Sequence, residues 1–235
     1  MVDSELAFEI WENRDRILSN LKKKDIDEYR YLKEKFESSG GSSDPEFQAR
    51  FKKFYRLNFV GLSNKWKDRF FELLSAKCDD LKCILLELYG IRRLDGKCSV
   101  QCVFATKLVH TVNNDEPIYD SMVGEVLNRK VEGSNRDEKV DSCVEIHNFL
   151  MEKYRELINN SKVKEVISEF RSKFGVKRED VSDVKALDFI IWSLGKIKQN
   201  LKENRPAKNG SIRSPQVRRT PLVSASGGTT GQVNL

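Results

Sequence analysis

The sequence predicts an almost entirely α-helical fold, and three observations carry that expectation. Apolar residues recur at helical spacing along most of the chain. Only 5 Pro and 13 Gly interrupt its 235 residues, and no run of alternating β-branched residues is long enough to predict a strand. Charged residues make up 33% and hydrophobic residues 39% of the chain, a composition typical of amphipathic helices packed around a sizeable core.

The first part of the chain predicts three helices, at residues 5–21, 26–36 and 45–57. The first two follow apolar stripes of helical period. The SSGGSS stretch at 38–43 predicts a flexible loop before the third helix. Asp44 can serve as the N-cap of that third helix, and Pro45 fits its first helical position.

The middle of the chain predicts three more helices, at residues 64–74, 81–91 and 99–112. Ser63 can cap the first of them, and either Asp79 or Asp80 can cap the second. The second and third are strongly apolar, which is typical of buried helices. Asp95-Gly96 predicts the turn that joins these two helices.

The remaining helices are expected at residues 121–130, 138–160, 163–174 and 184–201. Asp120 opens the first of them after a polar loop at 113–117, and a charged turn is expected at 133–137. Gly175 is expected to end the third helix as its C-terminal cap. Ser182 is expected to cap the last one.

A change of composition near Glu203 predicts two parts, a helical domain at residues 1–202 and a disordered basic tail at 203–235. Pro, Gly, Ser and Thr dominate the tail, so it buries too little apolar surface to offset its chain entropy. The chain carries a net charge of +6, and five basic residues but no acidic one lie from Arg205 onward. Such a tail would add non-specific contacts to phosphates, although a solvated tail is the simpler interpretation.

The five cysteines predict reduced thiols, because their number is odd and no secretory signal precedes them. Cys98 and Cys102 share a helix face near His110, but without a CxxC pair they predict buried apolar residues, not a metal site. No run of residues approaches the roughly 18 apolar positions of a membrane span. We therefore expect a cytoplasmic monomer without a metal or other cofactor.

Two charged residues in the segment 103–127 are the candidates for chemistry. Lys107 lies within an apolar helix, and Asp120 lies at a helix start. In the structural interpretation Lys107 is a surface residue whose stem covers apolar groups. Asp120 is then an N-cap, worth about 1 kcal/mol. The residues alone favour this interpretation.

The segment Ala105–Leu108, followed by Pro117–Asp120, resembles a bacterial group of 8-oxoguanine-DNA-glycosylase-like proteins in the helix-hairpin-helix DNA glycosylase superfamily. The stretch DFIIW at 188–192 is similar to the closing helix of that group. In the superfamily a lysine stands on the second helix of the hairpin, and a catalytic aspartate caps a following helix. The sequence departs from the superfamily at the glycines of the hairpin, where it reads QCVF at 101–104.

The resemblance implies a two-lobed helical bundle that acts as a DNA glycosylase, a hydrolase that excises a damaged or modified base from double-stranded DNA. Some members of the wider set act in antiviral defence against phage DNA with modified bases. Asp120 would stabilise positive charge at C1′ of the sugar. Lys107 would attack C1′ and cleave the strand as an AP lyase if its amine is deprotonated, and water would attack if it is not.

Four further residues are implied as contacts of the flipped-out base. They are Tyr119, His110, Trp192 and Asp188. For the aromatic residues a place in the core is the simpler interpretation, and Asp188 also fits a solvated position on its helix.

Two other function classes stay open. The chain could be a non-catalytic helical interaction protein of a defence or regulatory operon, or a nucleic-acid-binding domain that acts through its tail. It contains no glycine-rich phosphate loop and no nucleophile elbow. Removing the residues beyond Glu203 separates these classes, because a tail-driven binder would lose affinity and salt dependence together while a glycosylase would keep base excision.

Overall fold

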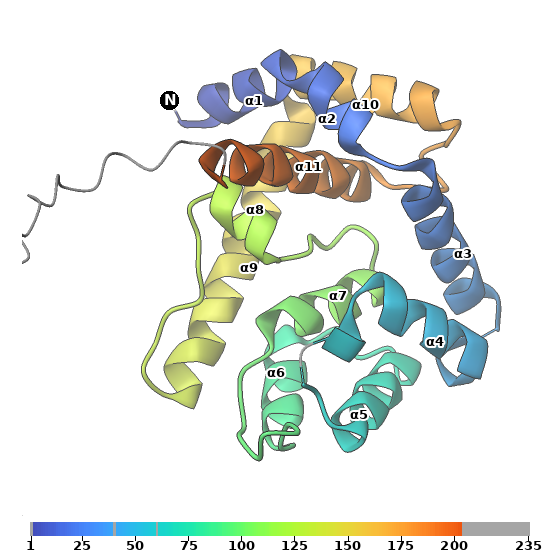
Figure 1. The fold of residues 1–235 in the computed structure, drawn as a ribbon, viewed down its shortest axis with the longest axis vertical. Coiled ribbons are helices and arrows are strands. Elements are labelled where there is room, and N and C mark those ends of the chain that lie inside the picture. The colour runs from blue at the N-terminus through green and yellow to red at the C-terminus, as the bar shows by residue number, and fades with distance from the viewer. Residues whose placement is uncertain (1, 40, 60, 204–235) are drawn as a thin grey trace, which may run out of the picture. The chain divides into compact units, whose positions relative to one another are not determined.

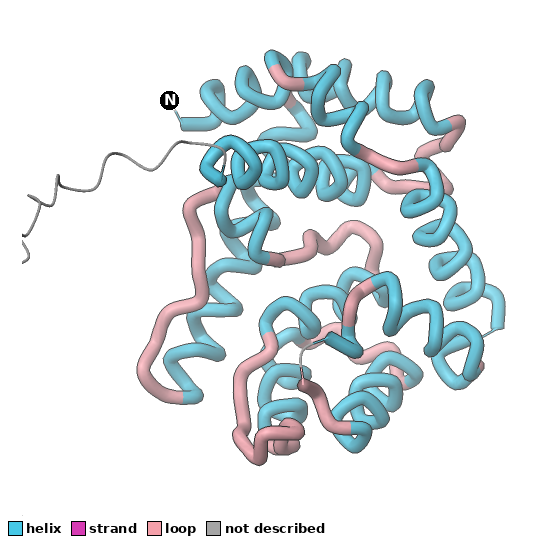
Figure 2. Tube along the Cα trace, in the orientation of Figure 1, coloured by secondary structure: helices cyan, strands magenta, loops and turns pink. Residues whose placement is uncertain are grey.

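The computed structural model describes residues 2–39, 41–59 and 61–203. Figure 1 shows their arrangement, and Figure 2 shows that they consist of helices and loops. These residues contain eleven α-helices and two short 3₁₀ helices, and no strand, so the all-α prediction is confirmed. The tail predicted from residue 203 lies, apart from Glu203 itself, outside the described residues. None of the described helices is both long and apolar enough to cross a membrane.

All the predicted helical regions are helical in the structure, with some changes of boundary. The helices are α1 (Val2–Glu12), α2 (Arg14–Asn20), α3 (Lys23–Ser39), α4 (Pro45–Phe54), α5 (Asn64–Ser75), α6 (Leu81–Tyr89), α7 (Cys102–Val112), α8 (Ser121–Val126), α9 (Arg136–Asn159), α10 (Ser161–Phe174) and α11 (Asp183–Glu203). The 3₁₀ helices are η1 (Gly41–Ser43) and η2 (Leu57–Phe59).

Hydrogen bonds at the helix ends confirm the predicted caps. The side chains of Asp44, Ser63 and Asp80 accept from backbone N–H groups at the starts of α4, α5 and α6. Ser182 Oγ accepts from Lys185 N at 3.2 Å at the start of α11. Gly175 ends α10 with φ 64°, the left-handed conformation that glycine adopts without strain.

The structure corrects three predicted segments. The helix expected at 5–21 is interrupted at Asn13, which separates α1 from α2 and whose side-chain amide donates to Glu9 O at 2.9 Å. Of the flexible loop expected at 38–43, the part to Ser39 belongs to α3 and Gly41–Ser43 form a 3₁₀ turn, while residue 40 lies outside the described residues. The helix expected at 121–130 ends at Val126, and Asn128 beyond it adopts φ 51°.

The helices form two groups in Figure 1, with α4 to α7 in one and α1, α2, α8, α10 and α11 in the other. The long helix α9 contacts members of both groups, and α3 packs on α4. The contact between α8 and α11 is close, because a Cβ atom at Gly195 would lie 2.8 Å from Met122 O. The N-terminal and C-terminal helices also meet, since Ser193 Oγ donates to Ile17 O at 2.9 Å. The core thus joins segments from both ends of the described chain.

Candidate active site

Lys107 places its amine in largely apolar surroundings. Lys107 is a half-buried residue of α7. Its Nζ donates to Tyr55 O at 3.3 Å and lies 5.4 Å from the centre of the Tyr55 ring and 5.1 Å from that of Phe104. Burial lowers the pKa of the Lys107 amine to about 8, and the negative charge of Asp120 opposes this shift. A substantial fraction of the amine is therefore neutral near physiological pH.

Asp120 caps α8, as the structural interpretation predicts. Its Oδ1 accepts from Met122 N at 2.8 Å and from Val123 N at 2.9 Å. Within the described part of the chain, its Oδ2 accepts no hydrogen bond. The half-buried carboxylate also acts electrostatically on Lys107 and Asp188. Asp120 is thus a cap whose second oxygen is available beside other charged groups.

Asp188 points inward from α11 and is paired with a lysine that sequence reasoning missed. Asp188 Oδ2 accepts from Lys185 Nζ at 2.7 Å. The Lys185 amine lies 5.0 Å from the centre of the Tyr29 ring and 4.6 Å from that of Phe189. Burial raises the pKa of the Asp188 carboxyl, and the charge of Lys185 opposes the shift. The spacing of three residues on one helix was the available signal for this pair.

Tyr154 on α9 adds a buried hydroxyl that no sequence signal distinguished from the core. The residue is 1% exposed, and among the described residues its hydroxyl has no hydrogen-bond partner of normal geometry. Burial raises the pKa of the Tyr154 hydroxyl, and the charges of Asp188 and Asp120 raise it further. A buried polar atom without a partner is uncommon in folded proteins. This one lies near two carboxylates.

These five residues form what we call the polar cluster: Lys107, Asp120, Tyr154, Lys185 and Asp188. They come from α7, the start of α8, α9 and α11, and so from both groups of helices. Isolated buried charges are costly, and here two amines are balanced by two carboxylates. Because the opposite charges offset one another, these groups can stay charged although they are largely buried.

His110, a predicted base contact, is a core residue in the structure. It is fully buried, its Nδ1 lies 2.6 Å from Glu116 O, and its Nε2 lies 3.2 Å from Tyr29 Oη. Burial lowers the pKa of His110 to about 3, so the ring is neutral at ordinary pH. With both nitrogens occupied inside the protein, the structure favours the core interpretation over contact with a base.

Tyr119 and Trp192 differ in how much of their rings is accessible. Tyr119 is buried, and its hydroxyl donates to Arg129 O at 3.3 Å. Trp192 is partly exposed on α11, one turn after Asp188, and Lys196 Nζ lies 5.6 Å from the centre of its ring. Asp188, Trp192 and Gly195 are spaced to share one helix face. Since Gly195 packs against Met122 near the start of α8, this face looks toward the helix that Asp120 caps.

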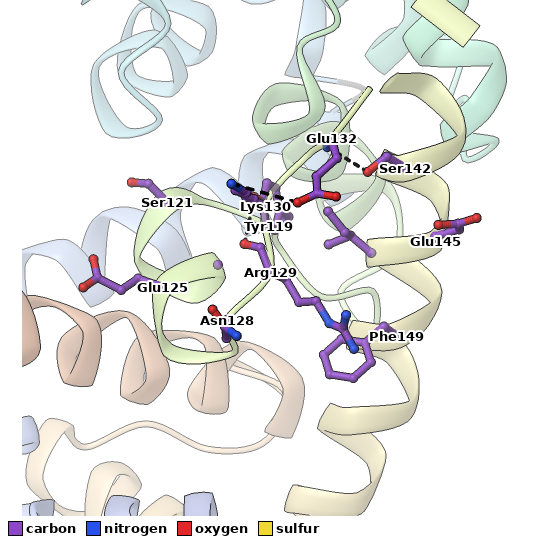
Figure 3. Close-up of a pocket in the computed structure, with 12 residues that line it drawn as sticks. Tyr119, Ser121, Glu125, Asn128, Arg129, Lys130, Glu132, Ser142, Glu145 and Phe149 are labelled. Atoms are coloured by element: carbon purple, nitrogen blue, oxygen red, sulfur yellow. Dashed lines mark hydrogen bonds and ion pairs between the residues drawn. The ribbon is translucent and has the colours of Figure 1, made fainter. Parts of the chain in front are cut away.

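An open pocket of about 800 Å³ borders both chain neighbours of Asp120. Figure 3 shows Tyr119 and Ser121 on one side and Glu145 and Phe149 of α9 on the other. The guanidinium of Arg129 lies 4.3 Å from the centre of the Phe149 ring. The lining carries both acidic and basic side chains and does not include Lys107 or Asp120. The pocket is therefore a neighbour of the polar cluster and not its opening.

Metal ligation has no support among the described residues. They contain no group of three or more His, Cys, Asp or Glu side chains placed to hold a metal ion. Cys102 is buried at the start of α7, as predicted, but Cys98 is exposed and lies before this helix, so the prediction of a shared, buried helix face is wrong for Cys98. The chemistry that the structure offers therefore lies in the polar cluster.

The polar cluster combines two groups that can take part in covalent chemistry. An amine with a pKa of about 8 is a nucleophile or base near neutral pH, and a carboxylate can stabilise a developing positive charge. No family model matches the chain, and no curated protein or solved structure is found to be similar to it. The function must therefore be inferred from the polar cluster and the sequence segment that carries it.

Proposed function

We propose that this chain is a DNA glycosylase that excises a damaged or modified base, with Asp120 and Lys107 as catalytic residues. The observation that carries the proposal is the hydrogen bond of 3.1 Å from Tyr119 N to Thr106 Oγ1, which holds the start of α8 against the helix of Lys107, with the Asp120 charge acting on the Lys107 amine. The amine lies within a helix and the carboxylate caps the next one, as the resemblance to helix-hairpin-helix glycosylases implies. The proposal includes the two-lobed fold of that superfamily, which the two groups of helices support.

In the proposed reaction the target nucleotide leaves the duplex and its sugar enters the polar cluster. The Asp120 carboxylate stabilises positive charge at C1′ as the bond to the base weakens. The neutral Lys107 amine forms a bond to C1′ and the glycosidic bond breaks. The electron pair of the glycosidic bond leaves with the base. Loss of a proton from the nitrogen and opening of the sugar ring give an imine, from which strand cleavage follows.

The proposed base site lies on the face of α11 that carries Asp188 and Trp192. The Asp188 carboxylate would accept hydrogen bonds from N–H groups of the base, and the partly exposed Trp192 ring would stack on it. The hydroxyl of Tyr154, which has no hydrogen-bond partner of normal geometry among the described residues, would gain one when a base or sugar enters. The substrate class is therefore double-stranded DNA with a base that can be flipped out.

One observation favours the second candidate, a non-catalytic helical interaction protein. Asp120 Oδ1 accepts two backbone hydrogen bonds, so a capping role alone accounts for an acidic residue at this position. On that interpretation the polar cluster only stabilises the fold. The two candidates differ in what happens when the charge of Asp120 is removed while its cap is kept.

An excision assay on duplexes with damaged and phage-modified bases tests the proposal. Asp120→Asn keeps a good N-cap but loses the charge, and we expect its excision rate to fall by at least about a hundredfold. Asp80→Asn is the matched control, because Asp80 caps α6 in the same way but lies outside the polar cluster. Borohydride trapping should fail in Lys107→Gln. Wild-type activity in Asp120→Asn would remove Asp120 from the mechanism and favour the interaction protein.

A further inference from the structure

The loop that links Lys107 to Asp120 forms hydrogen bonds with α7, the helix that precedes it. It runs from the end of α7 to Asp120 at residues 113–120. Tyr119 N donates to Thr106 Oγ1 at 3.1 Å, and His110 Nδ1 lies 2.6 Å from Glu116 O. Thr106 and His110 are four residues apart and share a face of α7. The loop therefore folds back over the helix that carries Lys107.

Glu116, in this loop, forms hydrogen bonds through its backbone and through both oxygens of its carboxylate. Its backbone N donates to Asn113 O at 3.0 Å, and its backbone O accepts from His110. Its side-chain Oε1 accepts from Asn113 Nδ2 at 3.4 Å, and its Oε2 lies 2.8 Å from His147 Nε2. All its polar groups thus have partners, and two of the partners are histidines on α7 and α9.

His147, on α9, makes the second contact between Glu116 and a helix. It is 7% exposed, and its Nδ1 is buried without a hydrogen-bond partner among the described residues. Because a carboxylate oxygen accepts hydrogen bonds, His147 Nε2 donates to Glu116 Oε2.

The two histidines that hold Glu116 are the only ones in the chain. One comes from α7, which carries Lys107, and the other from α9, which carries Tyr154. From this geometry we propose that Glu116 is a positioning residue that, held by His110 and His147, fixes the loop so that Asp120 faces Lys107. The inference rests on the proposed function of Asp120 and Lys107. It assigns a role in that function to both histidines, and neither contacts the substrate.

Glu116 can position Asp120 because the two residues are close to each other along the chain. Pro117 and Ile118, between them, are buried, so a displacement of Glu116 passes to Asp120 through packed residues. A catalytic carboxylate has to stay within about 0.5 Å of its productive position. Misplacement by about 1 Å can lower a rate by about a hundredfold. The ties at Glu116 therefore act on catalysis through Asp120.

The kinetic test uses base excision by the full chain. His147→Leu and Glu116→Ala should lower kcat by about tenfold to a hundredfold, with KM within about threefold of wild type. His147→Gln keeps a donor near the place of Nε2 and should retain kcat within about threefold. Tyr31→Phe removes a hydrogen bond to Glu46 that involves no residue of the loop and serves as the control. Unchanged kcat in both His147→Leu and Glu116→Ala would overturn the inference.

Hydrogen exchange separates failure of this inference from failure of the proposed function. The amides of Tyr119, Met122 and Val123 bond to Thr106 Oγ1 or to Asp120 Oδ1. In the folded Glu116→Ala and His147→Leu variants they should exchange at least about tenfold faster, while α10 is unchanged. If the wild type excises no base, the proposed function fails and these amides alone decide whether Glu116 positions the loop. Unchanged protection in both variants would overturn that role.

Discussion

The buried ion pair between Lys185 and Asp188 allows a quantitative test of the polar cluster. The side chains are 3% and 10% exposed, and Lys185 Nζ lies 2.7 Å from Asp188 Oδ2. Lys185→Met keeps most of the side-chain length but leaves the Asp188 carboxylate without its closest cation. Removing one partner of a buried pair costs about 3–5 kcal/mol. We expect a loss near the lower limit, about 3 kcal/mol, because Lys107 still acts on Asp188.

Urea unfolding followed by circular dichroism measures this loss. With a slope of about 2 kcal/mol per molar urea, the midpoint at pH 7.5 should fall by about 1.5 M. The pH dependence gives a second check. Because burial raises the pKa of Asp188, the folded protein holds this proton more tightly than the unfolded chain. The associated stabilisation is fully present below the unfolded pKa, about 3.9, and is lost as pH rises through the folded pKa.

Without Lys185 the pKa of Asp188 should rise further, so the loss of stability in Lys185→Met should shrink as the pH is lowered from 7.5 to 5. The slope should approach about 1.4 kcal/mol per pH unit where one proton is taken up. Lys82→Met is the control, because its pair with Asp141 has a similar distance of 2.9 Å but is more than half exposed. Its midpoint should stay at the wild-type value. A Lys185→Met midpoint equal to wild type, or a loss independent of pH, would refute the reasoning.

Two further predictions concern Lys107 and the contact between α8 and α11. Because the pKa of Lys107 is about 8, its neutral amine should rise from about a tenth to about nine tenths of the population between pH 7 and 9. Borohydride trapping should therefore increase roughly tenfold, and a flat profile would contradict the role of this amine. Gly195→Ala should destabilise the protein by about 1–3 kcal/mol in thermal unfolding, since its Cβ would lie 2.8 Å from Met122 O. Gly90→Ala is its control, with the nearest atom at 3.5 Å, and equal melting of the two variants would argue against the close contact.

The sequence predicted most helices because their signals are local. Asp44, Asp80 and Gly175 act within one helical turn, and their caps form as expected. Boundaries differed where a turn interrupted an apolar stripe of helical period, as at Asn13. They also differed where a left-handed residue ended a helical stripe, as at Asn128. Neither event changes the apolar pattern from which helices are predicted.

The candidate site was less predictable, because its groups meet only in the tertiary structure. Lys107 and Asp120 were identified through a resemblance, and their catalytic roles stay a prediction. Lys185 appeared to be one lysine among many in a charged helix, and its place between Tyr29 and Phe189 depends on packing against α3 and along α11. Tyr154 fitted the apolar stripe of α9. That no described residue gives its hydroxyl a hydrogen bond of normal geometry is visible only in three dimensions.

The position of α11 at the end of the described chain has a consequence for synthesis on the ribosome. This helix brings Lys185 and Asp188 to the polar cluster and covers α2 and α8. A nascent chain therefore already carries Lys107 and Asp120 while their balancing pair is still in the exit tunnel. A message cut before codon 185 would yield a product with open apolar helix faces and an unfinished cluster. Translation of α11 therefore supplies both the helix that covers α2 and α8 and the charged pair Lys185 and Asp188.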